Sequence, residues 1–183
     1  MGRFKQLLRG EQAALVLALL LLCVVLSILT PVFLSAANLK NVLRDASLIA
    51  IAGIGMVMVV LAGEIDLSPG SVQAVVGILS VQVLNESGSI LLALLGALAV
   101  GLVIGLCNGL LVTRAGINSL IATLGTMAIL RGGAMVGTQA VSIQGRVEGF
   151  TEVGTGYWGP LPIPVVLAVV LLVLFYLVLH HTP

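Results

Sequence analysis

About six long runs of apolar residues follow one another along this 183-residue sequence. An α-helix rises about 1.5 Å per residue, so such runs are long enough to cross most of a hydrocarbon core roughly 30 Å thick. Only 8% of the residues are charged and 60% are hydrophobic, and so few charges cannot cover a water-facing surface. The sequence therefore predicts an all-α, polytopic integral membrane bundle with transmembrane helices at about 13–30, 47–63, 69–84, 89–112, 119–137 and 163–179.

Charge bias predicts how these segments cross the membrane. Residues 1–12 carry three basic side chains, so we expect a cytoplasmic tail followed by a transmembrane domain over 13–183. The first apolar run exceeds the roughly 7–15 residues of a signal peptide, which favours an uncleaved first span. Residues 35–46 are expected to form a short amphipathic helix at the outer interface. Six crossings would leave both termini and Arg114 in the cytoplasm.

A polar interruption lies between the second and third runs, where residues 61–71 read LAGEIDLSPGS. Carboxylates at membrane depth are costly unless they are paired or face a cavity. We expect one helix to end near Gly63 and the next to begin with a serine N-cap and a proline at its first position. An ordinary loop at the water interface remains the alternative. The candidates for a gate or helix break are Glu64, Asp66, Ser68, Pro69 and Gly70.

Three glycines recur at four-residue spacing in the fourth run, at Gly101, Gly105 and Gly109. This spacing places them on one helical face, where two helix backbones can approach closely. Glycine is common in membrane helices, but three in register favour a helix-packing seam.

A long polar segment, 138–160, separates the last two predicted spans. Loops of this length in compact proteins are usually functional or disordered. Its candidate functional side chains are Arg146, Glu148, Glu152 and Trp158.

The sequence offers no set of residues for catalysis. Its two histidines are adjacent at the end of the last span, and no serine has a plausible base partner. No phosphate-binding G-x-x-x-x-G-K-[ST] loop is present, and Cys23 and Cys107 lie in apolar runs. We therefore expect no catalytic residues, no metal site, no cofactor and no enzyme activity, and a net charge of +1 gives no indication of nucleic-acid binding.

Three segments resemble one family of membrane proteins. AGEIDLSPGS at 62–71 resembles the G-G/E-I-D-L-S-V-G-S signature of ribose/xylose-type permeases, the membrane subunits of monosaccharide ABC importers. NLKNVLRDAS at 38–47 and NGLLVTRAGINSLIATLGTMAILRG at 108–132 are similar to further family segments, in the same order. Pro69 stands where the family usually has valine, which leaves the backbone at this position less certain.

The resemblance implies a permease that passes a ribose-, xylose- or fructose-like monosaccharide across the bacterial inner membrane. Its implied partners are a separate ABC ATPase, a periplasmic sugar-binding protein facing 138–160, a second permease chain and membrane lipid. The sequence resembles only the first half of such permeases and stops before their cytoplasmic coupling block. We therefore expect the 183-residue product alone to insert in the membrane without supporting ATP-driven uptake.

Within this interpretation, Glu64 and Asp66 are expected to shape the cytoplasmic-side gate or the helix break without contacting the sugar. Two other functions remain open from the sequence. One is a small structural membrane protein. The other is a proton-coupled secondary transporter that uses Glu64 and Asp66.

Overall fold

The computed structural model describes residues 11–181, which are predominantly helical and confirm the predicted all-α class. The elements are α2 (Glu11–Leu29), α3 (Ala36–Leu61), α4 (Pro69–Ser87), α5 (Ile90–Thr113), α6 (Ser119–Thr138), α7 (Glu152–Thr155), β1 (Tyr157–Trp158), β2 (Leu161–Pro162) and α8 (Ile163–His181). Most of the predicted tail, 1–12, lies outside the described residues, as do Thr182 and Pro183. The division into tail and transmembrane domain therefore stays a prediction.

Four helices of the described chain, α3, α5, α6 and α8, are long and apolar enough to cross a membrane. The apolar part of α2, Ala13–Leu29, is shorter. Helix α4 has 19 residues but includes polar side chains such as Gln73 and Gln82. The polytopic membrane class is thus confirmed, whereas the count of six spans stays a prediction.

The chain forms two compact units, Met1–Ala46 and Ser47–Pro183. In the first, α3 begins after a turn in which the Ser35 hydroxyl accepts from the Asn38 amide at 3.2 Å. The Asn38 side chain donates to the carbonyl of Phe33 at 2.7 Å. The prediction of a separate short helix over 35–46 is wrong, because α3 continues without interruption from Ala36 to Leu61. Its polar first turns and its apolar remainder share one unbroken ladder of backbone hydrogen bonds.

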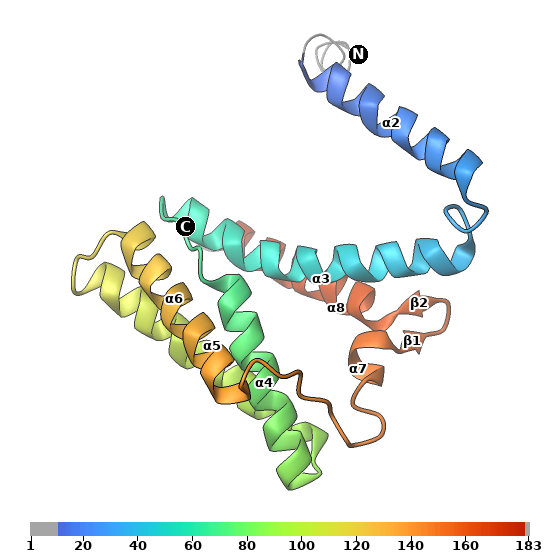
Figure 1. The fold of residues 1–183 in the computed structure, drawn as a ribbon. Helices are drawn as coiled ribbons and strands as arrows, with labels where there is room; N and C mark the ends of the chain where they lie inside the picture. Colours follow the sequence, from blue (N-terminus) through green and yellow to red (C-terminus); the bar gives the residue numbers. More distant parts are fainter. Residues whose placement is uncertain (1–10, 182–183) are drawn as a thin grey trace. The chain divides into compact units, whose positions relative to one another are not determined.

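In the second unit, α4 packs against both α5 and α6, which also contact each other (Figure 1). The buried apolar residues are few and mostly small: Leu84, Ala93, Ala122 and Ala168. Most large apolar side chains are exposed instead. Small residues between helices and large apolar ones outside are expected where the surrounding solvent is lipid.

Short polar residues cap the starts of α5 and α6, and a glycine follows the end of α4. The Ser89 hydroxyl accepts from the Leu92 amide at 3.3 Å and caps α5. Asn118 caps α6 by accepting from the Leu120 amide at 3.0 Å. Helix α4 ends at Gly88, whose φ of 67° suits glycine. The predicted end of this span near residue 84 is three residues short, because α4 extends through Ser87 and only Gly88 leaves the helical conformation.

After α6, the chain runs without regular structure to the single turn of α7 and then forms the antiparallel β1–β2 hairpin (Figure 1). Tyr157 pairs with Pro162 and Trp158 with Leu161. Helix α8 follows β2 directly and contacts both α7 and β2.

Candidate functional site

The predicted helix break is present between α3 and α4. Helix α3 ends at Leu61 and α4 begins at Pro69, which occupies the first helical position as expected. Gly63 has a φ of +79°, and the Glu64 amide donates to the carbonyl of Val59 at 3.1 Å. A left-handed residue directly after a helix is a common C-terminal cap and turns the chain away from the helix axis. Residues 62–68 therefore form a defined non-helical segment.

Ser68 occupies the N-cap position, but its hydroxyl does not cap α4. It donates to Oδ1 of Asp66 at 2.7 Å, and the Ser68 amide donates to the same oxygen at 2.8 Å. The side chain is 1% exposed. The predicted cap is thus right in position but makes no side-chain cap, because the Ser68 backbone is helical (φ −80°, ψ −18°) and not extended as in residues whose side chain caps a helix.

Two further polar side chains extend this contact across helices. Nδ2 of Asn108, in α5, donates to the Ser68 hydroxyl at 3.1 Å. The hydroxyl of Thr126, in α6, donates to Oδ1 of Asn108 at 2.6 Å. Asn108 is only 7% exposed, so these bonds satisfy polar atoms that would otherwise be costly to bury. The four side chains form one network, hereafter the Asp66–Thr126 network: Asp66, Ser68, Asn108 and Thr126.

The backbone of the break is also bound to α6. The Ile65 amide donates to the Ser119 hydroxyl, and the Leu67 amide donates to the Thr123 hydroxyl, both at 3.3 Å. Backbone groups outside a helix need such partners at membrane depth. These bonds and the burial of Ser68 attach the break to α6, while Gly63, Ile65 and Leu67 stay exposed. Whether the break lies at membrane depth or at the water interface stays a prediction.

A cavity of about 370 Å³ opens beside the break. Side chains from α3, α5, α6 and the break line it: Met58, Val59, Ala62, Glu64, Ile65, Asp66, Gly105, Asn108, Gly109, Val112, Thr113, Ser119 and Thr123. Glu64 and Asp66 thus share one cavity wall with otherwise mainly apolar residues. The wall therefore carries two carboxylates together with the amide of Asn108 and the hydroxyls of Thr113, Ser119 and Thr123.

The three glycines of the predicted seam have different surroundings. A Cβ added at Gly101 would lie 4.0 Å from the Val76 side chain of α4, which is ordinary contact distance. A Cβ at Gly105 or Gly109 would meet no other atom within 4 Å, and both residues line the cavity instead. Close packing within the described chain is therefore limited to the Gly101 end. The packing of Gly105 and Gly109 against a further helix stays a prediction.

The four loop candidates do not gather into one cluster. The Arg146 amide donates to the side-chain oxygen of Asn85 at 2.8 Å, while the Asn85 amide group donates to the carbonyl of Gln144 at 3.0 Å. This clamp fixes the first part of the loop to the end of α4. Glu148 follows it, Glu152 begins α7 and Trp158 lies in β1. Their role towards a binding protein stays a prediction.

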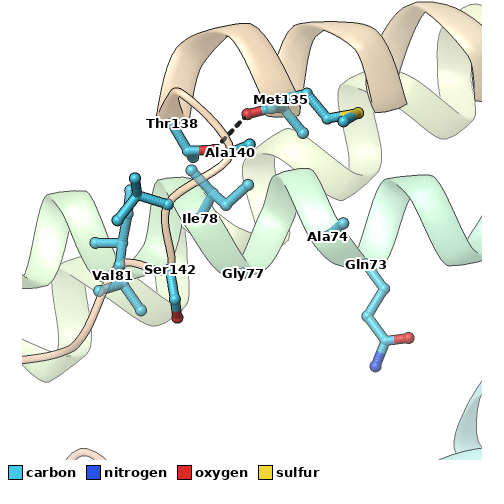
Figure 2. Close-up of a pocket in the computed structure, with 12 residues that line it drawn as sticks. Gln73, Ala74, Gly77, Ile78, Val81, Met135, Thr138, Ala140 and Ser142 are labelled. Atoms are coloured by element: carbon cyan, nitrogen blue, oxygen red, sulfur yellow. Dashed lines mark hydrogen bonds between the residues drawn. The ribbon is translucent and has the colours of Figure 1, made fainter.

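A second cavity, of about 670 Å³, lies between α4, the end of α6 and the segment after α6. Gln73, Gly77 and Ile78 of α4 line it together with Thr138 and Ser142, and Figure 2 shows the Gln73 side chain pointing away from the end of α6. The Ala140 amide donates to the carbonyl of Met135 at 2.9 Å, which turns the chain back at the end of α6. None of the described residues that line this cavity is titratable.

Sequence reasoning missed several residues that the structure brings to the break and the loop: Asn85, Asn108, Ser119, Thr123 and Thr126. Each is a polar residue in or beside an apolar helix. Intramembrane polar side chains usually face the protein interior and find partners there. Their position in apolar runs was the available signal, although it could not identify the partners.

The chain is similar to sugar import permeases. It is 37% identical over 180 residues to the ribose import permease protein RbsC of Escherichia coli K12, an alignment that covers 94% of this chain and 54% of the relative. It is 35% identical over 172 residues to RbsC of Haemophilus influenzae, covering 91% and 53%. It is 31% identical over 172 residues to the L-arabinose ABC transporter permease protein AraH of Azospirillum brasilense, covering 94% and 51%.

The chain thus spans about half the length of the curated relatives it matches. No solved structure gives a significant match. The family model described as "Branched-chain amino acid transport system / permease component" matches residues 38–183, which include the break, the Asp66–Thr126 network and both cavities. This match and the apolar helices indicate a multi-pass inner-membrane protein. The chain belongs to the family of branched-chain amino acid transport system permease components.

Proposed function

We propose that this chain belongs to the membrane-spanning subunit of a binding-protein-dependent ABC importer for a monosaccharide. The observation that carries the proposal is the 37% identity to a ribose import permease over 94% of the chain. Relatives named for L-arabinose and galactofuranose import support a sugar and leave the choice among pentoses and hexoses to experiment.

The geometry of the break supports a role next to the translocation path. Non-helical backbone at membrane depth is tolerated where it is buried in protein or lines a water-filled cavity. The hydrogen bonds of the break to α6 and its place in the wall of the cavity of about 370 Å³ support such a setting. The Asp66–Thr126 network links this backbone to α5 and α6, so a shift of either helix would move it. Under the proposal, Glu64 and Asp66 shape the cytoplasmic-side gate and do not bind the sugar.

The proposal includes three protein partners. A separate ATPase supplies the energy, a periplasmic binding protein delivers the sugar to the side of 138–160, and a second permease chain completes the pore. Arg146, Glu148 and Glu152 are the candidate contacts to the binding protein. Each of these three side chains lies on the loop that the Asn85 clamp attaches to α4.

Uptake of radiolabelled sugars tests this function. A full-length permease gene that includes this sequence is expressed with an ABC ATPase gene and a sugar-binding-protein gene in a strain without pentose importers, and ribose, xylose, arabinose, fructose and galactose are compared. We expect uptake of at least one sugar that needs all three components and stops when the ATPase is made catalytically inactive.

The same assay separates the proposal from proton-coupled transport. A protonophore, applied while cellular ATP is maintained, should leave the initial uptake rate unchanged. Uptake that a protonophore abolishes and that survives an inactive ATPase would instead assign Glu64 and Asp66 to proton coupling and reject the importer.

A further inference from the structure

All amphipathic aromatic residues of the sequence lie near the two ends of one helix. The sequence contains one tryptophan and two tyrosines. Tyr157 and Trp158 form β1, just before α8 (Ile163–His181), and Tyr176 lies in the last two turns of that helix. Tyrosine and tryptophan concentrate where a membrane meets water, because one end of each ring system is apolar and the other forms hydrogen bonds.

The hairpin that carries the first two aromatics is fixed to the start of α8. Tyr157 pairs with Pro162, which is fully buried, and Trp158 pairs with Leu161. The Ile163 amide donates to the carbonyl of Gly156 at 3.0 Å, which joins the first residue of α8 to the residue before β1. The height of the hairpin along the membrane normal is therefore set by α8.

The hairpin nevertheless points its large side chains outward. Trp158 is 75% exposed, Tyr157 48% and Leu161 46%. Two short strands are not stable alone in water, so the exposed apolar area of this hairpin needs an apolar or interfacial setting.

The length of α8 matches the thickness of the hydrocarbon layer of a bilayer. Its 19 residues span about 28 Å at about 1.5 Å per residue, close to the roughly 30 Å of hydrocarbon in a membrane. Most of its large apolar side chains are exposed, as expected for a surface that contacts lipid. At its far end, the ring of Tyr176 stacks on that of His180 with centroids 5.7 Å apart. Both ends thus carry side chains suited to the headgroup region.

We propose that the Tyr157–Pro162 hairpin is a lipid anchor, with the indole of Trp158 in the headgroup region at one end of α8. The partner is the phospholipid interface itself. Sequence reasoning placed Trp158 among the side chains facing a binding protein. The attachment of the hairpin to the first turn of α8 favours lipid, because it holds Trp158 at the level where the apolar helix begins. This inference does not depend on the proposed transport function.

The single tryptophan makes a direct test possible. The full 183-residue chain is reconstituted in phosphatidylcholine–phosphatidylglycerol vesicles, and tryptophan is excited selectively. Its emission is then quenched by lipids brominated near the headgroup, by lipids brominated near the acyl-chain end, and by aqueous iodide. We expect the strongest quenching from bromine near the headgroup and an emission maximum to the blue of free tryptophan.

Two reference variants calibrate depth, both in a Trp158→Phe background. Val169→Trp places the indole on the exposed middle of α8, and Glu148→Trp places it on the exposed loop. Circular dichroism must show equal helix content in all three proteins. The native signal should fall between the two references. Deep-bromine quenching equal to that of Val169→Trp, or iodide quenching equal to that of Glu148→Trp, would overturn the anchor.

A final measurement separates lipid from protein as the partner. A tryptophan-free variant of a ribose-binding protein, loaded with ribose, is added to the vesicles. The emission of Trp158 should not change, because lipid already surrounds the ring. A blue shift together with lost iodide access would assign Trp158 to a binding-protein interface and reject lipid anchoring.

Discussion

The side-chain amide of Asn108 donates to the hydroxyl of Ser68 across 3.1 Å and joins the C-terminal part of α5 to the residue before α4. Ser68 in turn donates to Asp66, and Asn108 accepts from Thr126. The Ser68 hydroxyl therefore links the helix break to α5 directly and to α6 through Asn108. Several predictions about stability and transport depend on this coupling.

Removing either end of the Asn108–Thr126 contact should destabilise the protein in a non-additive way. Asn108→Ala and Thr126→Val each remove one partner of this part-buried hydrogen bond, and Asn108→Ala also removes the bond to Ser68. Interhelical hydrogen bonds in membranes contribute about 0.6 kcal/mol on average and up to about 1.7 kcal/mol. A double-mutant cycle, measured by unfolding in bicelles, should give a coupling energy in that range. If the two single effects simply add, the network does not link α5 to α6 energetically.

Asp66→Asn should weaken the fixation of the break while preserving its shape. The neutral amide accepts the two hydrogen bonds from Ser68 less strongly than a carboxylate, at a cost of about 1 to 2 kcal/mol. We expect a lower uptake rate with unchanged sugar preference and unchanged affinity for the loaded binding protein. Glu86→Gln is the control, because Glu86 is exposed and neither lines this cavity nor belongs to the network. An altered sugar preference in Asp66→Asn would place this residue in the translocation path.

Gly63→Ala should destabilise the chain, whereas Gly70→Ala should not. Neither added Cβ meets another atom within 4 Å, so any difference arises from the backbone. Gly63 has a φ of +79°, where a side chain costs about 1 to 2 kcal/mol. Gly70 is helical, where alanine is favoured by about 0.5 to 1 kcal/mol. Thermal unfolding in detergent measures both, and equal behaviour would show that the left-handed turn is not required.

Gly101→Leu should disturb packing inside the chain, whereas Gly105→Leu should disturb its assembly with a further helix. Leucine at Gly101 would push on Val76 and disturb the contact between α4 and α5 inside the chain. Leucine at Gly105 has free space in the described chain and should leave the chain folded, but block a helix from packing there in the assembled protein.

Helix content and cross-linked assembly distinguish these outcomes, with Val103→Leu on another face as the control. Normal assembly of Gly105→Leu would remove the predicted packing role of this glycine.

Reporter fusions should test the predicted topology. Fusions after Arg114 and after His181 are expected to report the cytoplasm, and a fusion after Glu148 the outside. The reason is that basic residues in short loops remain preferentially on the cytoplasmic side. A cytoplasmic signal at Glu148 would be incompatible with six crossings that begin inside.

Local chemistry explains why several boundaries could be predicted from the sequence. Proline at position 69 lacks an amide hydrogen, so it begins a helix without losing a bond, and α4 begins there. Gly63 is the residue in the left-handed region after α3. The apolar runs themselves locate α5, α6 and α8 to within about two residues, because only a helix satisfies its own backbone in lipid.

Contacts between distant residues could not be predicted in this way. Ser68 looked like a cap, yet its hydroxyl bonds Asp66 and Asn108, the latter 40 positions away. Gly105 and Gly109 looked like a seam, yet they line a cavity, because α4 approaches this face of α5 at Gly101 and not at the other two glycines.

The sequence alone thus determined the membrane class, the family resemblance and the position of the break, since these follow from composition, motif and local backbone preference. Only the tertiary structure decided what holds the break in place. Hydrogen bonds from Asn108, Ser119 and Thr123 depend on how α5 and α6 are rotated and packed beside it. A polar residue in an apolar helix indicates that a partner is needed, but the partner is selected by helix packing in three dimensions.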